Sequence, residues 1–296
     1  MNKVLITGGS GLIGKRLSYL LTCKGYEVRI LSRYERLGCN YKTFVWKIKE
    51  QHIDENAFKD LNHIIHLAGA GIADKRWSKK RKKEIIYSRV ASTNLLYNTI
   101  KRLKTPLSSF ISASATGYYG AITSEAIFKE IDKPATDFVG TVCSLWEKSI
   151  FKFNEINIRT VALRTGIVLS KHGGALKKIK TPIITPIGNG KQYIPWIHID
   201  DLCELYIRAI EDTNFKGVFN AVSNEHQSNF SFSKTVAMVY KVPFLNVGIP
   251  KFILRIIFGE MSTIIINGSR VSSNKLEYNG FKIKFKTLEN TLKNIL

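Results

Sequence analysis

The stretch KVLITGGSGLIG at residues 3–14 decides the fold. Its first four residues resemble a buried strand, and they run directly into glycines spaced as GxxGxxG. Leucines at helical spacing follow in residues 15–24, and Gly25 is placed to end that helix before a second strand at residues 27–31. A strand, a glycine loop, a helix and a strand in this order predict the first unit of a parallel α/β sheet.

The three glycines of this loop have separate physical roles. Gly8 permits a tight turn, Gly11 lets the backbone approach a pyrophosphate, and Gly14 lets the helix pack closely on the strand. The phosphates then lie at the helix N-terminus, where free N–H groups and the helix dipole favour negative charge. The pattern therefore predicts a dinucleotide site of the Rossmann type, with loop contacts from Gly8, Ser10, Gly11, Leu12, Ile13 and Gly14.

The end of the second strand bears on which dinucleotide binds. An NAD-specific site usually places an acid about 20 residues beyond the loop to hold the ribose 2′-hydroxyl. Here the strand ends in Leu31-Ser32-Arg33, with no carboxylate before Glu35. Arg33 is suited to a 2′-phosphate and to stacking on adenine, although a plain surface arginine is the alternative. We therefore predict NADP(H), with Ser32 and Arg33 at its adenosine end.

Two later strands end in small residues that leave room for a ligand. The segment 62–67 runs into Leu67-Ala68-Gly69, and the segment 108–113 runs into SATGYYG at 114–120. Ligands of open α/β sheets bind at the carboxyl ends of the strands. We expect further cofactor contacts from Leu67, Ala68, Gly69 and Ser112.

The alternation of strands and helices weakens after residue 166, where turn-forming glycines and prolines become frequent. Residues 218–223 again resemble a strand, one that returns to the first domain. We predict an α/β fold with a doubly wound parallel sheet: a Rossmann domain over 1–165 with a returning strand near 216–224. A smaller, interleaved C-terminal substrate lobe covers 166–215 and 225–296. Asp200 or Asp201 is expected to cap a helix over 202–210.

The charge balance is strongly basic, with 45 Lys and Arg against 23 Asp and Glu and a formal net charge of +22. Such a field attracts polyanions, which include nucleic acid, an anionic membrane surface and a phosphorylated small molecule. The densest basic run is KKRKK at 79–83, and a solvated helix face is its alternative interpretation. We expect a small-molecule substrate and keep nucleic acid and membrane as lesser alternatives.

The spacing of the cysteines does not match that of a Cys or Cys/His metal site. The four cysteines form no CxxC pair and no cluster with histidine; they are Cys23, Cys39, Cys143 and Cys203. Reduced thiols and the absence of a leader before the first strand predict a cytoplasmic protein. The apolar stretch 252–266 is interrupted by Arg255 and Glu260, and it is too short and too charged to span a bilayer.

Segments spread over nearly the whole chain resemble one known superfamily. These segments are TGGSGLIG at 7–14, LAGAGIADKRW at 67–77, SRVASTNLL at 88–96, SASATGYYG at 112–120, LRTGIVLSKHGGALKK at 163–178, WIHIDDL at 196–202 and FGEMSTIIINGSRV at 258–271. The chain resembles the extended short-chain dehydrogenases/reductases, which include the nucleotide-sugar epimerases. It is most similar to their atypical branch, labelled epimerase family protein, whose members carry their own C-terminal domain.

The resemblance implies a catalytic serine at Ser114, followed by a Tyr-xxx-Lys pair. Aligning Glu147 with the acid that commonly follows the lysine places Val139 at the tyrosine position and Cys143 at the lysine position. Valine has no proton to give, and a thiol is not a cation. The superfamily's standard pair is therefore absent, a departure that is characteristic of the atypical branch.

Other side chains near the predicted strand ends are candidates for the missing chemistry. Tyr118 and Tyr119 follow a strand end, where a phenol is able to act as a general acid. In the DKRW segment, Lys75 and Arg76 suit an anionic substrate and Trp77 suits stacking on a planar one. In extended members a later segment closes over the ligand, which makes Gln192 a further candidate.

Two functions follow from these features. The first is an NADP(H)-dependent oxidoreductase or nucleotide-sugar-epimerase-like enzyme that acts on a small anionic substrate. The second is a non-catalytic protein that senses NADPH and signals to a partner. Retention of Ser114 favours the enzyme, whereas loss of the Tyr-xxx-Lys pair favours the sensor. A homodimer is expected by analogy with the superfamily.

Overall fold

The computed structural model describes residues 2–35, 40–179 and 181–296, and its largest element is an eight-stranded sheet. The strand order is β13-β8-β6-β5-β1-β2-β3-β4, and every neighbouring pair is parallel except β3 and β4. The strands are β1 (Lys3–Thr7), β2 (Glu27–Ser32), β3 (Lys42–Lys47), β4 (His52–Ile53), β5 (His63–His66), β6 (Ser109–Ala115), β8 (Arg159–Thr165) and β13 (Gly217–Ala221).

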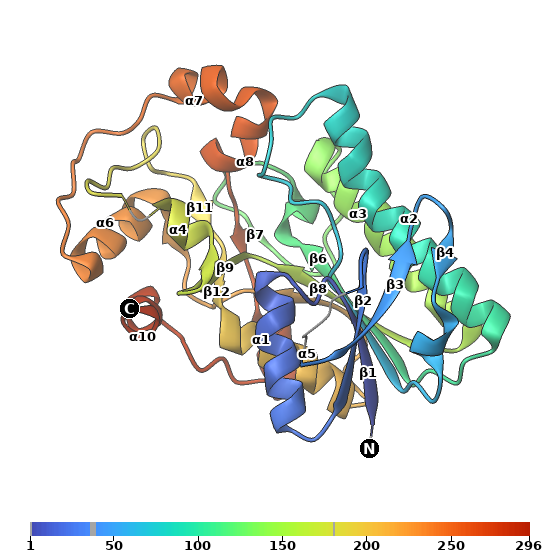
Figure 1. Cartoon of the computed structure of the whole chain (residues 1–296). Helices are drawn as coiled ribbons and strands as arrows, with labels where there is room; N and C mark the ends of the chain where they lie inside the picture. The colour runs from blue at the N-terminus through green and yellow to red at the C-terminus, as the bar shows by residue number, and fades with distance from the viewer. Residues whose placement is uncertain (1, 36–39, 180) are drawn as a thin grey trace.

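Helices cover both faces of this sheet (Figure 1). On one face α1 (Leu12–Cys23) and α5 (Ile199–Glu211) enclose an apolar core with the sheet. On the other, α2 (Lys79–Leu103) and α3 (Phe138–Phe151) enclose a second core. Two cores separated by a mostly parallel sheet make a doubly wound α/β fold, as predicted. Short 3₁₀ turns occupy η1 (Glu55–Phe58), η2 (Thr116–Tyr119) and η3 (Lys152–Ile156).

Most of the remaining elements follow β8 in the chain (Figure 1). They are β7 (Ile127–Phe128), β9 (Ile167–Ser170), β10 (Gly173–Gly174), α4 (Ala175–Ile179), β11 (Tyr193–Ile194), β12 (Trp196–His198), β14 (Gln227–Ser228), α6 (Asn229–Tyr240), α7 (Lys251–Phe258), η4 (Gly259–Ser262), α8 (Thr263–Ile266), β15 (Arg270–Val271), α9 (Asn274–Tyr278) and α10 (Leu288–Ile295). Helices α4, α6 and α10 share their own apolar core with β9 and β12. The chain returns from this region to the main sheet through β13, which pairs with β8.

The glycine loop has the backbone that its spacing predicts. Gly8 has a φ of +72°, in the region that favours glycine, and a Cβ at Gly14 would overlap the carbonyl oxygen of Gly8. Helix α1 begins at Leu12, three residues earlier than the leucine spacing indicated, because the extended backbone of Gly11 forms its N-cap. It ends as expected before Gly25, which has a φ of +83° and donates its N–H to the Thr22 carbonyl at 3.0 Å.

The expected aspartate cap of α5 is wrong. His198 is the N-cap, and its Nδ1 accepts the backbone N–H of Asp200 at 3.0 Å. The Asp200 carboxylate instead accepts two hydrogen bonds from Arg16 of α1, at 2.7 and 3.0 Å. The Asp201 carboxylate accepts backbone N–H groups from residues 284–285. Both acids therefore join α5 to other parts of the chain, a use that local spacing does not reveal.

A buried histidine connects three elements of the main domain. His66, at the end of β5, has no exposed surface; its Nδ1 lies 2.7 Å from Thr7 Oγ1 on β1 and its Nε2 lies 3.1 Å from Ser92 Oγ on α2. Burial, assisted by the charge of Arg89, lowers the pKa of His66 to about 3. The imidazole is therefore neutral in the folded protein near pH 7.

This histidine predicts an acid-sensitive fold. Below its ordinary pKa of 6.5 the unfolded chain binds a proton at His66 that the folded protein excludes until pH falls to about 3. The free energy of unfolding should therefore fall by about 1.4 kcal/mol per pH unit across that window. Urea unfolding at pH 7, 5.5 and 4.5 measures the slope. A His66→Asn variant should show a shallower slope than the wild type, and an equal slope would contradict the prediction.

Candidate functional site

The N-terminus of α1 is built to receive an anion. Ser10 and Gly11 are exposed, and Leu12 and Ile13 are half-buried. The structure describes every residue of α1. No described side chain caps the helix, and no acid occupies its first turn. Its first N–H groups therefore lack a side-chain acceptor and, together with the helix dipole, favour a negatively charged ligand. A Cβ at Gly8 would lie 3.0 Å from the Leu67 carbonyl, so only glycine gives the loop this close approach.

Arg33 follows β2 and is exposed, whereas Ser32 is half-buried. Within residues 2–35, 40–179 and 181–296, no carboxylate forms an ion pair with Arg33. Its guanidinium is thus free to bind an anion near the carboxyl end of β2. The structure leaves residues 36–39 undescribed, and Cys39 lies among them.

The turn after β5 lies beside the glycine loop. Thr7 Oγ1 accepts the backbone N–H groups of Leu67 and Ala68, each at 3.1 Å. These bonds join the ends of β1 and β5 and leave Leu67 and Ala68 half-buried and Gly69 exposed. The small residues expected to border a ligand thus lie at the strand ends, as such a ligand requires.

Two of the predicted hydroxyl groups have protein partners. Ser112 has no exposed surface and its Oγ donates to the Ala113 carbonyl at 2.9 Å and to the His66 carbonyl at 3.3 Å. Ser114 is buried and its Oγ donates to Glu147 Oε1 at 2.6 Å. To donate a hydrogen bond to a ligand, either hydroxyl would have to give up a bond made within the protein.

Ser114 belongs to a buried network organised by an ion pair. Glu147 of α3 and Arg164 of β8 form two hydrogen bonds of 2.8 Å, and both side chains are almost wholly buried. Desolvation lowers the pKa of Arg164, but the hydrogen bonds and charge of Glu147 outweigh it and raise that pKa. The Arg164 guanidinium is therefore held as a cation inside the protein.

Tyr119 is the far end of this network. Its hydroxyl accepts from Arg164 Nη1 at 2.9 Å and donates to Asn220 Oδ1 of β13 at 2.7 Å. Burial raises the pKa of Tyr119 to about 12, although Arg164 opposes the rise. A phenol that is 1% exposed and already bonded on both sides is poorly placed to exchange protons with a substrate.

Tyr118 has a different environment. It is half-buried, and its hydroxyl has no protein partner in the part of the chain that the structure describes. The guanidinium carbon of Arg164 lies 3.3 Å from the centroid of its ring, a contact that holds the ring against the network by a cation–π attraction. Of the two tyrosines, Tyr118 is therefore the one with an available hydroxyl.

The positions that the family alignment assigns to tyrosine and lysine are both apolar here. Val139 and Cys143 lie on the buried face of α3. Burial raises the pKa of Cys143 to about 12, Glu147 adds to the rise, and the charges of Arg89 and Arg164 oppose it. The thiol is uncharged near neutral pH and is neither a cation nor an activated nucleophile.

Arg89 of α2 supplies a positive charge close to that thiol. Its Nη1 donates to the Ala70 carbonyl at 3.0 Å, and its guanidinium lies 5.0 Å from the Trp146 ring centroid. A Cβ at Gly69 would lie 3.3 Å from the guanidinium carbon, which places Arg89 directly beneath the turn after β5. No carboxylate of the described residues pairs with it. Arg89 lies in the SRVASTNLL segment, and residue spacing alone gives it no role.

The predicted substrate residues separate into exposed and buried groups. Lys75 and Arg76 are exposed, and Arg76 lies beside Gly259 of η4. Trp77 is buried: its ring packs edge-on against Phe138, 4.8 Å between centroids, and its Nε1 donates to the Ile72 carbonyl. Trp77 thus belongs to an apolar cluster, and its stacking on a ligand stays a prediction. Gln192 is also buried and its Nε2 donates to the Ile187 carbonyl at 3.2 Å.

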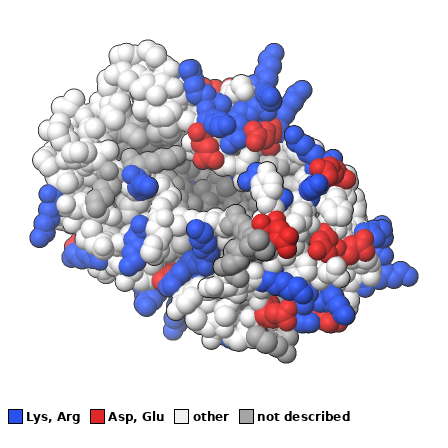
Figure 2. Space-filling view, viewed as in Figure 1, with Lys and Arg blue, Asp and Glu red and all other residues white. Residues whose placement is uncertain are grey.

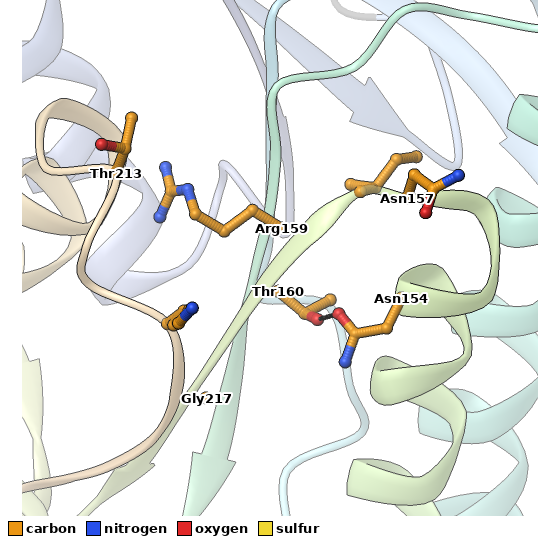
Figure 3. Close-up of a pocket in the computed structure, with 8 residues that line it drawn as sticks. Asn154, Asn157, Arg159, Thr160, Thr213 and Gly217 are labelled. Carbon is orange, nitrogen blue, oxygen red and sulfur yellow. Dashed lines mark hydrogen bonds between the residues drawn. The ribbon is translucent and has the colours of Figure 1, made fainter.

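A surface hollow of about 580 Å³ lies at the opposite end of the sheet (Figure 3). Asn154 and Thr160, joined by a hydrogen bond, line one side of it, and Thr213 and Gly217 line the other. Arg159 points into the space between them. Because this hollow opens at the amino-terminal ends of β8 and β13, it is not part of the site formed by the strands' carboxyl ends.

The described residues contain no group of three or more His, Cys, Asp or Glu side chains placed to hold a metal ion. Nor does any described helix combine the length and the apolar character needed to cross a membrane.

Comparison with known proteins identifies the family. Residues 4–139 match the NAD dependent epimerase/dehydratase family, and residues 249–295 match a domain of unknown function, DUF1731. An epimerase family protein of Staphylococcus aureus is 31% identical over all of this chain and 99% of its own length. One of Staphylococcus saprophyticus is 32% identical over the full length of both. The chain belongs to this epimerase family.

Solved structures agree with that assignment. The human epimerase family protein SDR39U1, crystallised with NADPH, has a TM-score of 0.86 and is 26% identical, covering 99% of this chain and 98% of that one. A nucleoside-diphosphate sugar epimerase of Corynebacterium glutamicum has a TM-score of 0.81 and is 27% identical, covering 100% of this chain and 58% of that one. The resemblance to the atypical epimerase family branch is thereby confirmed.

The buried ion pair of this epimerase family chain predicts a non-additive stability loss. Glu147→Leu should lower the free energy of unfolding by about 3–5 kcal/mol, because it leaves Arg164 charged and unpaired in the interior. The double variant Glu147→Leu/Arg164→Met should lose much less than the two single losses combined. Urea unfolding of all three variants measures this, with Glu55→Leu of the exposed Arg102–Glu55 pair as a control expected below about 1 kcal/mol. Additive losses would show that the two residues act independently.

Proposed function

We propose that this protein binds NADP(H) and uses it as an oxidoreductase on a small anionic substrate. The observation that carries the proposal is the N-terminus of α1, which no described side chain caps and which is reached through a loop too tight for any side chain at Gly8 or Gly14. At the next strand end lies Arg33, which forms no ion pair with a carboxylate of the described residues. The residues present fit the cofactor, since the loop suits a pyrophosphate and Arg33 suits a 2′-phosphate. The NADPH in the human relative's crystals supports this choice.

Each end of the cofactor has its own set of residues. The loop from Gly8 to Gly14 would hold the phosphates, and Ser32 and Arg33 would hold the adenosine ribose with its phosphate. Leu67, Ala68 and Gly69 would border the middle of the molecule. Arg89 would supply the cation that the superfamily's lysine supplies at the nicotinamide ribose, because it lies beside the position that Cys143 now occupies. NADPH, when bound, supplies the hydride.

Tyr118 is the proposed proton donor to the substrate. Its hydroxyl has no partner among the described residues, and the adjacent Arg164 fixes its ring. Ser114 and Tyr119, by contrast, serve through the network that positions Tyr118. Lys75 and Arg76 are exposed cations on the segment after β5, and they would attract an anionic substrate. By analogy with the superfamily, we propose a cytoplasmic homodimer.

One observation favours a second function, a sensor that binds NADPH without turnover. The lysine position holds a neutral thiol, and the Ser114 and Tyr119 hydroxyls are occupied by protein partners. Consumption of NADPH in the presence of carbonyl substrates separates the two functions, because a sensor would bind NADPH and leave it reduced.

The proposed role of Arg33 predicts a selective loss of affinity. Arg33→Ala should raise the Kd for NADPH about ten- to hundredfold, because a charge-assisted bond to the 2′-phosphate contributes about 1.5–3 kcal/mol. Affinity for NADH, which lacks that phosphate, should stay the same. Titration followed by nicotinamide fluorescence measures both, with Arg102→Ala as a matched surface control. If neither dinucleotide binds the wild type, the proposed function fails.

The proposed role of Arg89 predicts an unselective loss that a relocated cation repairs. Arg89→Ala should weaken NADPH and NADH by similar factors of about ten or more, since both contain the nicotinamide ribose. Adding Cys143→Lys to that variant should recover most of the affinity. The same fluorescence titrations measure binding, and thermal unfolding confirms that each variant is folded. Unchanged binding in Arg89→Ala would remove this residue from the site.

A further inference from the structure

Helix α7 presents an apolar face to solvent. Phe252 is 62% exposed and Ile256 is 69% exposed, and Ile253 and Ile257 are exposed as well. Only Leu254 of the eight residues is buried. The four exposed residues, called the α7 patch below, are spaced i, i+1, i+4 and i+5, so they lie on one side of the helix. Clustered apolar residues of this size on a surface indicate a binding face.

Cations accompany the α7 patch. Lys251 and Arg255 precede Phe252 and Ile256 by one residue each, and so they follow one margin of the apolar face. The chain leading into α7 carries two more exposed apolar side chains, Leu245 and Val247. An apolar face with a basic margin is the pattern of a helix that lies in a membrane interface, parallel to its plane.

The densest basic run of the chain lies next to the α7 patch. Lys79, Lys80 and Lys83 are exposed in the first turns of α2. Lys82 of the same run forms an ion pair with Glu260 of η4, which begins directly after α7, so the two features are neighbours across 178 residues of sequence. Figure 2, viewed as in Figure 1, shows uncharged surface over α7 beside Lys and Arg side chains gathered over the start of α2.

We propose that α7 and the start of α2 form a docking face for an anionic phospholipid surface. The apolar residues would enter the boundary between headgroups and acyl chains, and the lysines would contact the phosphates. Charge selects this occupant over a second copy of the chain at this face, because a symmetric pair would bring two copies of the basic run at 79–83 together. The proposal is independent of the cofactor and its chemistry.

Vesicle co-sedimentation tests the docking face with the full chain. The wild type should bind vesicles of phosphatidylcholine with 30% phosphatidylglycerol, chosen here as a test mixture of about physiological charge, at least tenfold more tightly than pure phosphatidylcholine. Phe252→Ser/Ile256→Ser should lower binding to the anionic vesicles at least tenfold. Ile131→Ser, which removes a 90% exposed isoleucine elsewhere, should change it less than twofold. Lys79→Glu/Lys80→Glu/Lys83→Glu should abolish the preference for anionic vesicles.

Three outcomes would overturn the proposal. The first is vesicle binding that is equal with and without phosphatidylglycerol, and the second is binding that is equal in the wild type and Phe252→Ser/Ile256→Ser. The third is a wild-type oligomer in sedimentation equilibrium that the same double variant dissociates, since the α7 patch would then be covered by a second copy. Thermal unfolding of each variant establishes that it is folded, and because the changes lie on the surface we expect midpoints close to that of the wild type.

Discussion

The ion pair between Glu147 of α3 and Arg164 of β8 is the interaction on which the carboxyl edge of the sheet depends. Two buried charges are costly unless each is fully paired, and here every neighbour contributes to that pairing. Ser114 of β6 donates to the carboxylate, and Tyr119 of η2 accepts from the guanidinium and passes the connection to Asn220 of β13. Three parallel strands, a helix and a 3₁₀ turn are thus held in one arrangement by groups that must all be satisfied together.

That arrangement changes how the epimerase family site is understood. In the superfamily the serine and the tyrosine face the substrate, and a lysine on the following helix holds the cofactor. Here Ser114 faces inward, and Cys143 replaces the cation with a neutral thiol. In the proposed cofactor site the positive charge comes from Arg89 of α2, whose guanidinium contacts the Ala70 carbonyl and the Trp146 ring. Under the proposal, Arg89 serves cofactor binding and Tyr118 serves proton transfer, so the chain could bind NADPH with or without turnover.

The basic character of the chain also has a spatial pattern. The lysines that start α2 lie beside the apolar helix α7, and the ion pair of Lys82 with Glu260 joins the two. Charge that is dispersed along the sequence is therefore partly concentrated beside an apolar face. The proposed docking face uses other residues than the glycine loop and Arg33. Binding to a membrane surface and binding of a dinucleotide would therefore involve different parts of the chain.

The sequence by itself determined the doubly wound sheet and the glycine loop. The sheet follows from the repeated alternation of apolar strands and helices along the sequence, and the loop from local geometry, because Gly8 has a positive φ and a Cβ at Gly14 would overlap Gly8 and Gly9. Only the tertiary structure decided what Trp77, Ser114 and Arg89 touch. Their partners lie on other elements, and residue spacing carries no information about which side chain a distant segment brings alongside. The strand ends were thus predictable, whereas the chemistry displayed there depended on packing.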